Sequence, residues 1–414
     1  MKIVLNAASA KMGGALSYLT NLLRNLPPQQ SEYQFFVYLP GETARRLTGL
    51  PANIQLCPVP DEDIGGGRRV WWEQITLRRL LRKMKVDLLF STANFAMFRC
   101  PVKQILLVRN ALYFSRMYQQ TLLPRHGLKM RIAFRLRRWM ICQSAKSADI
   151  VMTPTHAMLN ALQTHVQVAA TKGIVNHYGV GELVEGKMAH RSIERQSSPV
   201  RLLYISLYAE HKNLTTLLKA LPLLNRDRNQ EFSLKTTVNP NWDAASRMLT
   251  HKDDIDLARL PDITPWVKFA GPLSQEEIEE QYRTADIFVF PSITESFGHP
   301  MAEAMAHGLP IVAADTPVNR EMCGNAALYF SPFEPDELAQ AIHRVATDPP
   351  LGRSLGLEGK RRARTMFRWD THVRRILEIA QGTQQEVLQE SCQDSLTQQR
   401  EECLLAPTVT NRPV

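Results

Sequence analysis

The chain has 414 residues, of which 44% are hydrophobic and 22% are charged, and it carries a formal net charge of +10. This length predicts two or three domains of about 100–200 residues each, and the composition excludes a largely disordered protein. No run of about 18 apolar residues is present, so no membrane-spanning helix is predicted. The positive charge indicates an acidic partner, for which nucleic acid, an anionic membrane and a phosphorylated substrate are all candidates.

The chain begins with an apolar run at residues 2–7, which leads through Gly13 and Gly14 into a helical stretch. This start lacks the long apolar core and the cleavage site of a signal peptide. The six cysteines are scattered without metal-like spacing, and no histidine group has such spacing. We therefore expect a cytoplasmic protein with unpaired thiols, no metal site and no cofactor.

Short apolar runs alternate with amphipathic helical stretches along nearly the whole chain. The expected strands of the first half lie at 2–7, 35–40, 86–92, 103–110 and 149–155. The polar stretch 185–199 interrupts this alternation, which resumes with a strand at 200–207. A βαβα alternation predicts a parallel sheet covered by helices on both faces.

The sequence therefore predicts an α/β protein with two doubly wound domains, at residues 1–184 and 200–365, joined by a linker at 185–199. The residues 381–414 are rich in glutamine and poor in apolar residues. We expect them to form a disordered tail or a partly helical appendage.

The segment 125–146 combines many basic residues with large apolar ones such as Trp139. A basic amphipathic helix of this kind can bind an anionic membrane surface. A domain helix with one buried face and one basic exposed face fits the same residues equally well.

The stretch "ESFGHPMAEAMAHGLPIV", residues 295–312, follows an apolar run that is typical of a buried parallel strand. Pro300 suits the first position of a helix, and Gly308 suits its end. Glu295 is then expected in the loop that follows the strand, and Glu303 in the first turn of the helix.

The carboxyl end of a strand is where open α/β sheets bind ligands. The free N–H groups at the start of the helix suit a phosphate, and the two carboxylates suit the hydroxyl groups of a sugar. From the residue types alone, an ordinary acid near a helix start and a solvated loop glutamate are equally good interpretations.

Residues 285–342 as a whole resemble the donor-site core of the retaining, GT-B-fold glycosyltransferases of family 4, also called group 1. Glu295 and Glu303 match the E-x7-E motif of that family, and weaker similarity extends over most of the chain. The resemblance implies two Rossmann-like domains that face each other across a cleft. It also implies that residues 366–380 form a helix that returns to the N-terminal domain.

The resemblance further implies a role for each matched residue. Glu303 would hold the ribose of a nucleotide, and Glu295 would contact the transferred sugar. Lys212 would neutralise the diphosphate, which gains negative charge as it leaves. The other donor-binding positions would be Gly13, Gly14, Ser206, Gly271, Leu273, Gly298, His299, Pro300 and Met301.

Two positions depart from the family pattern. Many members have an arginine where this chain has Leu207, so one phosphate-binding cation is missing; His211 or an arginine elsewhere is a candidate substitute. Many members also have a histidine at the end of an N-domain strand near the reacting carbon. Here Arg109 and Asn110 stand in that region, and we assign Asn110 to the catalytic position, although a structural asparagine at a strand end fits equally well.

These features together predict a hexosyltransferase, with mannose as one candidate sugar, that acts in the synthesis of cell-surface polysaccharide such as lipopolysaccharide. The donor would be a GDP- or UDP-sugar and the acceptor a glycan or a lipid-linked molecule. The resemblance implies a metal-independent front-face reaction that retains the anomeric configuration.

We expect the protein in the cytoplasm, with peripheral contact to the inner face of the cytoplasmic membrane through residues 125–146. The alternative is a catalytically degenerate protein of the same fold that only binds a nucleotide-sugar. Nucleic-acid binding has no motif behind it and is not expected.

Overall fold

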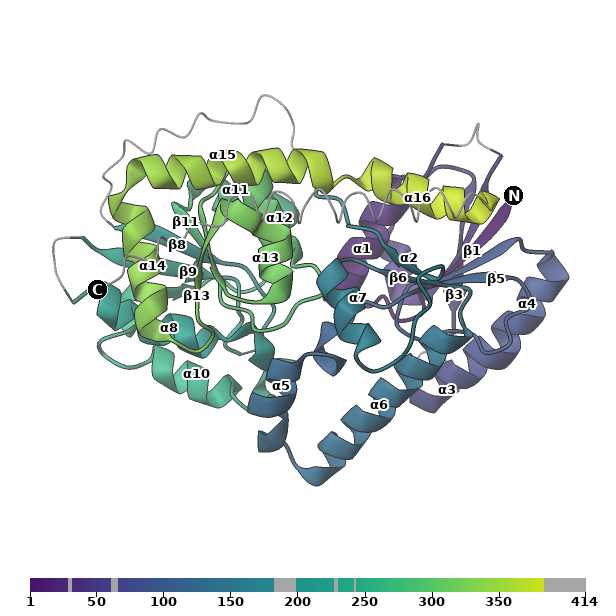
Figure 1. Cartoon of the computed structure of the whole chain (residues 1–414), viewed down its shortest axis with the longest axis horizontal. Coiled ribbons are helices and arrows are strands. Elements are labelled where there is room, and N and C mark those ends of the chain that lie inside the picture. Colours follow the sequence, from purple (N-terminus) through teal and green to yellow (C-terminus); the bar gives the residue numbers. More distant parts are fainter. Residues whose placement is uncertain (29–31, 61–65, 182–198, 227–229, 242, 383–414) are drawn as a thin grey trace, which may run out of the picture.

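The structure, a computed structural model, consists of two lobes placed side by side, each built on one β-sheet (Figure 1). The described residues are 1–28, 32–60, 66–181, 199–226, 230–241 and 243–382. Almost all of the predicted linker at 185–199 and of the predicted tail at 381–414 therefore lies outside the described residues.

The first lobe contains a seven-stranded parallel sheet. In spatial order its strands are β3 (Ile54–Val59), β2 (Gln34–Pro40), β1 (Lys2–Asn6), β4 (Leu88–Ser91), β5 (Lys103–Leu107), β6 (Ile150–Thr153) and β7 (Gly173–Val175). Runs such as β4 and β6 are buried along their whole length, because helices cover both faces of the sheet. The strand order reverses between β1 and β4, so the sheet is doubly wound.

The helices of this lobe are amphipathic. In α1 (Gly13–Arg24), for example, the buried residues recur on one face of the helix, at Tyr18, Leu19, Leu22 and Leu23. The other helices are α2 (Gly41–Arg46), α3 (Gly66–Trp71), η2 (Trp72–Thr76), α4 (Leu77–Met84), η3 (Ala111–Tyr113), α5 (Arg116–Thr121), η4 (Leu123–Arg125), α6 (Leu128–Ser147) and α7 (His156–Gln163).

The second lobe repeats this construction with a six-stranded parallel sheet. Its spatial order is β10 (Val267–Phe269), β9 (Phe232–Thr236), β8 (Val200–Tyr204), β11 (Ile287–Phe290), β12 (Ile311–Ala314) and β13 (Ala327–Phe330), with the reversal between β8 and β11. Its helices are η5 (Glu210–Lys212), α8 (Leu214–Leu224), α9 (Asp243–Ser246), α10 (His251–Ala258), η6 (Thr264–Trp266), α11 (Gln275–Thr284), α12 (His299–Ala306), α13 (Pro317–Cys323), η7 (Gly324–Ala326), α14 (Pro335–Thr347) and α15 (Pro349–Met366). The predicted α/β fold with two doubly wound sheets is confirmed.

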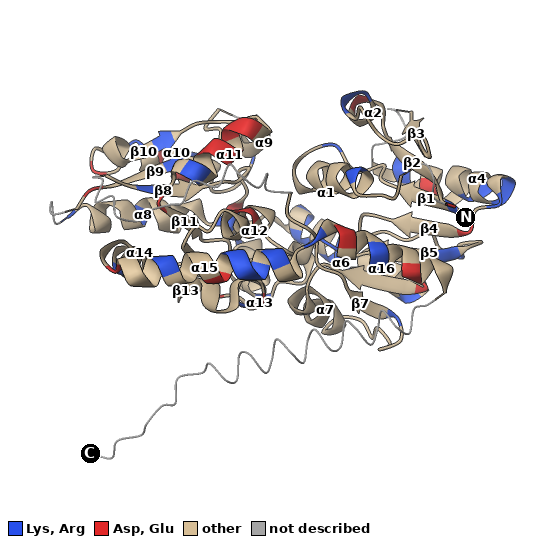
Figure 2. Ribbon diagram, turned by 90° about the horizontal axis from the view of Figure 1, so that it is seen from above, with Lys and Arg blue, Asp and Glu red and all other residues tan. Residues whose placement is uncertain are grey.

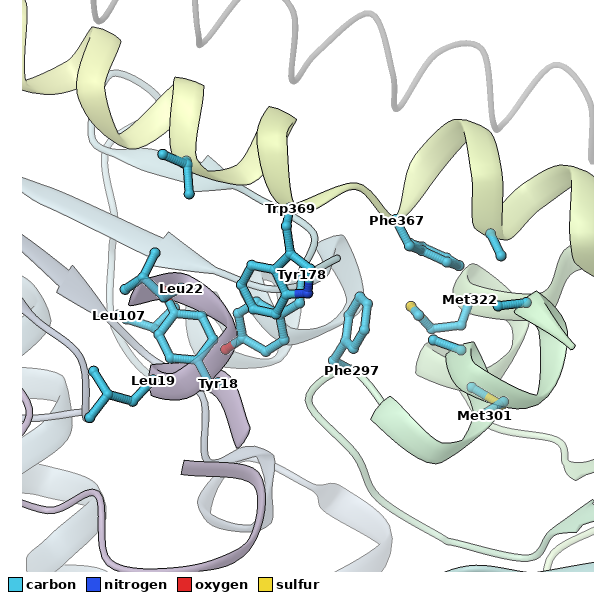
Figure 3. Packing of buried hydrophobic residues seen from close by; sticks show 14 of the residues in the cluster. Tyr18, Leu19, Leu22, Leu107, Tyr178, Phe297, Met301, Met322, Phe367 and Trp369 are labelled. Carbon is cyan, nitrogen blue, oxygen red and sulfur yellow. The ribbon is translucent and has the colours of Figure 1, made fainter. Parts of the chain in front are cut away.

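The last described helix, α16 (Trp369–Gln381), lies on the first lobe, although it follows α15 of the second lobe directly (Figure 1). The hydroxyl of Tyr18 in α1 lies 2.9 Å from Nε2 of His372 in α16. Tyr178 lies between Tyr18 and Phe297 of the second lobe and stacks on Trp369 (Figure 3). The apolar core therefore continues from one lobe into the other beneath the crossover.

Lys and Arg are spread over both lobes, including α4 and α15 (Figure 2). The net positive charge thus does not by itself mark one surface. None of the helices in the described ranges is long and apolar enough to cross a membrane.

Candidate active site

A cavity of about 300 Å³ lies between the two lobes. It is lined from the first lobe by Ser9, Ala15, Ala93, Asn94 and residues 109–112, and from the second lobe by His211 and residues 294–296. These segments follow β1, β4, β5, β8 and β11, so the cavity opens at the carboxyl ends of both parallel sheets. That edge is where doubly wound sheets bind ligands.

The loop after β11 and the start of α12 form one wall of this site. Gly298 precedes α12 with φ of +84°, and a Cβ atom there would lie 3.3 Å from the ring of Phe290 and from the Met301 side chain. Only glycine therefore fits this turn without strain. Its conformation aims the first N–H groups of α12 out of the sheet edge, where they can bind an anion.

Glu303 lies one residue further along α12 than expected. The helix begins at His299, and Pro300 is its second residue, so Glu303 is the fifth residue and stands in the second turn. The prediction of a first-turn acid was wrong, because the left-handed Gly298 allows the helix to begin before the proline. Gly308, with φ of +70°, ends the helix as predicted.

Lys212 and Glu295 contact each other, although they are 83 residues apart in the chain. Nζ of Lys212 donates a hydrogen bond to Oε1 of Glu295, which lines the cavity, and both side chains are mostly buried. Nζ also lies 5.9 Å from the centre of the Phe290 ring. Two of the three residues predicted to be catalytic are thus brought together, and their charges neutralise each other.

Glu303 is half-buried, and its Oε2 accepts a hydrogen bond of 2.8 Å from the hydroxyl of Tyr282. The same hydroxyl donates to the carbonyl oxygen of Pro300 over 3.0 Å. Desolvation by the surrounding protein raises the pKa of the Glu303 carboxyl from 4.5 to about 7, although the Tyr282 hydrogen bond opposes this shift. The side chain therefore titrates near neutral pH.

We expect the pH dependence of nucleotide binding to report this shift. An ionised carboxylate accepts hydrogen bonds from two ribose hydroxyls, whereas the protonated form has one oxygen occupied by its proton. Because the pKa is raised, the carboxylate form is lost as the pH falls below about 7. The affinity of wild type relative to Glu303→Gln should therefore rise roughly 20-fold between about pH 5.5 and pH 7.5.

Titration calorimetry with a nucleoside diphosphate at several pH values measures this ratio. The Glu303→Gln variant keeps the shape of the side chain but has no titrating group at this position. The pH dependence of its affinity therefore reports the titration of the ligand phosphate without that of Glu303. Parallel curves for the two proteins would show that Glu303 does not hold the ligand in its ionised form.

The remaining predicted donor residues of the second lobe lie at the same sheet edge. Ser206 follows β8, and its N–H donates to Oγ1 of Thr237 over 2.9 Å. Gly271 and Leu273 follow β10, and Gly271 has φ of +72° with open space around its Cβ position. Met301 is fully buried, so its predicted contact with the donor stays a prediction.

His299 opens α12 and stacks on the ring of Tyr178, with the ring centres 5.1 Å apart. Burial lowers the pKa of His299 to about 3, and the positive charges of Arg109 and Lys212 act in the same direction. The imidazole is therefore neutral at physiological pH and adds no cation to the site.

Two glycines and two polar residues of the first lobe face this wall. Gly13, with φ of +58°, lies so close to Leu207 that a Cβ atom would stand 3.2 Å from the leucine Cδ1. Oδ1 of Asn94 accepts hydrogen bonds from the backbone N–H groups of Arg109 and Asn110, over 2.9 and 3.1 Å. Oδ1 of Asn110 in turn accepts from the N–H of Leu112 over 3.2 Å and caps η3. Asn110 lines the cavity, and its catalytic role stays a prediction.

Contacts between the lobes were not foreseen from the sequence. The carboxylate of Glu321 in α13 accepts hydrogen bonds of 2.7 and 2.6 Å from the N–H groups of His156 and Ala157, at the start of α7. Burial opposes ionisation of Glu321, but hydrogen bonds from His177 and the backbone outweigh it and lower the pKa of this carboxyl. His126 of the first lobe also contacts Glu210 of the second lobe over 2.8 Å.

No group of three or more His, Cys, Asp or Glu side chains suited to a metal ion occurs within the residues that the structure describes. A second cavity, also of about 300 Å³, lies in the second lobe and is lined by parts of β8, β9 and β10 together with Trp266. It contains none of the predicted donor residues, and we place the site in the cavity between the lobes instead.

Two families of known proteins match the chain. The family described as "Glycosyl transferases group 1" matches residues 199–348, and the family described as "Glycosyltransferase Family 4" matches residues 12–181. The two matches cover the cavity-facing elements of both lobes.

Curated relatives have related names. The "MMP alpha-(1->4)-mannosyltransferase" of Mycolicibacterium hassiacum is 29% identical over 248 residues, which are 57% of this chain and 56% of that protein. The "O-antigen chain mannosyltransferase B" of Escherichia coli is 27% identical over 170 residues, 41% of this chain and 42% of that protein. The chain spans about half the length of these curated relatives.

Among solved structures, the sucrose-phosphate synthase of Thermosynechococcus elongatus superposes with a TM-score of 0.71 at 16% identity, over 93% of this chain and 98% of that one. The similarity shows a shared fold, and the two facing Rossmann-like lobes are the GT-B architecture.

Proposed function

The chain belongs to the glycosyltransferases of family 4, also described as group 1, and on this premise we propose that it is a retaining, metal-independent hexosyltransferase. The donor would be a nucleotide diphosphate-sugar, and the acceptor a glycan or a lipid-linked molecule. The observation that carries the proposal is the Lys212–Glu295 pair, which lies on the wall of the cavity between the lobes beside the start of α12.

In the proposed reaction Lys212 leaves Glu295 and binds the donor diphosphate. Together with the N–H groups at the start of α12, its fixed positive charge stabilises the negative charge that develops on the leaving phosphate. Glu295 is then free to accept hydrogen bonds from hydroxyls of the sugar. An acceptor hydroxyl attacks the anomeric carbon on the face from which the diphosphate departs, and the departing phosphate takes its proton.

Each lobe contributes to the position of the reactants. Glu303 and the residues after β10 would hold the nucleoside, while the loops after β1 and β5 of the first lobe would hold the acceptor. Placing both reactants between two lobes in contact lowers the entropic part of the barrier and excludes water, which would otherwise hydrolyse the donor.

Two features support the identity of the sugar and the acceptor. Both curated relatives described above are named mannosyltransferases, and one is named for the O-antigen chain. We therefore propose mannose as the first sugar to test, and a surface polysaccharide or lipopolysaccharide as the destination. The base of the donor, guanine or uracil, is the variable that the first experiment resolves.

The test is a thermal-shift screen of wild type and Glu303→Ala against GDP, UDP, dTDP and ADP. A nucleotide present at 100 times its dissociation constant should stabilise the folded protein by about 2.7 kcal/mol. The proposal predicts that one nucleotide stabilises wild type and has a much smaller effect on the variant. Release of that nucleotide from its mannose or glucose conjugate, faster when acceptor is added, would then establish transfer.

The alternative function is a binding protein of the same fold without catalysis, which Leu207 in place of a phosphate-binding arginine favours. This alternative predicts the same thermal shifts but no release of nucleotide with or without acceptor. Absence of any shift in wild type would argue against both functions.

We also propose that α6 binds an anionic membrane surface. Leu128, Ile132, Leu136 and Trp139 form a stripe on one face of this helix, and each is more than half exposed. The helix has no acidic residue, and Lys129, Arg135 and Arg137 are exposed near the stripe. An apolar stripe among basic residues fits the boundary between lipid headgroups and acyl chains.

We expect wild type to sediment with vesicles that contain phosphatidylglycerol and to bind phosphatidylcholine vesicles far more weakly. The double variant Leu136→Ser/Trp139→Ser should lose about tenfold or more in vesicle affinity, because two apolar side chains no longer enter the lipid. Leu357→Ser, which removes an equally exposed leucine from α15, is the matched control. Equal losses in both variants would contradict a role for α6.

A further inference from the structure

Arg109 lines the cavity between the lobes and carries a positive charge, but the proposed reaction gives it no role. It follows β5, and its backbone is held by the side chain of Asn94. The guanidinium carbon lies 5.3 Å from the centre of the Tyr18 ring, and Nη2 lies 3.9 Å from the position of a Cβ atom on Gly14. The side chain therefore runs along the start of α1 and faces the cavity between the lobes.

The charge of Arg109 has no carboxylate partner among the residues that the structure describes. Its recorded contacts are the Asn94 hydrogen bond to its backbone and the face of Tyr18. Lys212, in contrast, is paired with Glu295, and Arg201 is paired with Asp286. A half-buried guanidinium that faces the cavity without a carboxylate partner can therefore bind an anion that enters from outside the chain.

The surroundings of Arg109 are also positive. The amino end of α1 lies beside it, and the amino end of α12 faces the same cleft with His299, whose pKa is lowered partly by Arg109 and Lys212. Both helix ends present N–H groups and the positive end of a dipole. The cleft is thus arranged to hold more negative charge than Glu295 and Glu303 supply.

On the second lobe, the position that faces this region is Leu207. Its Cδ1 lies 3.2 Å from the Cβ position of Gly13, so the leucine contacts the first residue of α1. The leucine carries no charge, and the nearest cation of that segment that the proposed reaction uses is Lys212, five residues further along the chain. At the start of α1, the second lobe therefore places the apolar Leu207, and the first lobe places the guanidinium of Arg109.

We propose that Arg109 binds the diphosphate of the donor from the first lobe and supplies the cation that the second lobe lacks at Leu207. The inference rests on the proposed function, since it concerns the same donor. The planar guanidinium can hold two phosphate oxygens at once, while Lys212 contacts them from the opposite lobe. The donor diphosphate then joins the lobes, so donor binding itself favours their apposition and completes the site.

The experiment compares ligands with and without phosphates on matched variants. Arg109→Ala should weaken binding of the preferred nucleoside diphosphate by about 10- to 100-fold in titration calorimetry, and leave binding of the corresponding nucleoside unchanged. Arg109→Lys should recover part of the loss, because it keeps the charge without the fork. Arg116→Ala, which removes an exposed arginine from α5, should behave as wild type.

A second-site variant provides the sharpest outcome. Adding Leu207→Arg to Arg109→Ala restores a cation from the second lobe and should recover about tenfold or more of the lost diphosphate affinity. Equal weakening of nucleoside and diphosphate, with no rescue by Leu207→Arg, would overturn the inference and leave Arg109 as a packing partner of Tyr18. Thermal unfolding of each variant without ligand shows whether a loss of affinity comes from misfolding. If Arg109→Ala is misfolded, the affinities of Arg109→Lys and wild type are compared instead.

The outcome separates this inference from the proposed function. If wild type binds no nucleotide, the proposed function fails. If wild type binds a nucleoside diphosphate and Arg109→Ala binds it equally well, only the role of Arg109 fails.

Discussion

Lys212→Ala should lower the rate of sugar transfer by about 10²–10³-fold, the size expected when one preorganised group that stabilises developing charge is removed. The physical reason is the position of Nζ, which is mostly buried beside Glu295 and the Phe290 ring at the wall of the cavity. In such a place a cation acts in a low dielectric and needs no reorganisation as the diphosphate leaves. The ligand-free ion pair also means that Lys212 is already held close to its working position.

Steady-state release of the nucleotide product measures this effect, and the loss should appear in kcat as well as in kcat/KM. Lys219→Ala on α8 is the matched control, because Lys219 is an exposed lysine of the same lobe. Lys212→Arg should retain more activity than the alanine variant. A change confined to KM would mean that Lys212 binds the donor without stabilising the transition state.

Gly179→Ala should destabilise the protein by about 1–3 kcal/mol or more, the usual cost of overpacking a close contact. A Cβ atom at this position would lie 2.3 Å from the backbone nitrogen of Trp369 and 2.4 Å from its ring. Neither neighbour can move easily, because Trp369 stacks on Tyr178 and the N–H of Val180 donates to the carbonyl oxygen of Phe367 over 3.0 Å. The glycine is required by this close approach of two chain segments.

Urea unfolding followed by circular dichroism measures the loss in the free energy of unfolding. Gly181→Ala is the control, since nothing lies within 4 Å of its Cβ position, and it should change stability by about 0.5 kcal/mol or less. Because the contact joins α16 to the first lobe, protease cleavage after α15 should also be faster in Gly179→Ala. Similar stabilities for the two variants would show that the crossover relaxes around the added methyl group.

Much of the fold was readable in the sequence because its signals are local. Apolar runs such as 105–108 and 287–290 are unfavourable in water on either face, so they predict strands between helical layers. Gly298 and Gly308 likewise mark both ends of α12, because their left-handed backbone suits few other residues. Only the position of Glu303 within that helix was off, by the single residue at which the helix begins.

The active site was predictable only as a set of residues at one sheet edge. The sequence did not indicate that Lys212 pairs with Glu295, that Tyr282 holds Glu303, or that Asn94 orients the turn at 109–110. These partners come from different loops, and their distances depend on how the strands are ordered. From the sequence, Asn110 was either the catalytic group of the first lobe or a structural asparagine at a strand end. Its side chain caps η3 at the cavity wall, its catalytic role stays a prediction, and the adjacent Arg109 has no carboxylate partner among the described residues.

The sequence by itself therefore determined the two parallel sheets, the family and the strand-to-helix segment that carries both glutamates, since each depends on residues that are close together in the chain. The tertiary structure alone decided the charges of the site: Lys212 is neutralised by Glu295, the pKa of Glu303 is raised, and Arg109 has no carboxylate partner in the described part of the chain. Burial and the distance between charges control all three. The partners of Lys212 and Glu303 come from separate segments of the second lobe, whereas Arg109 faces them only because the first lobe lies across the cavity.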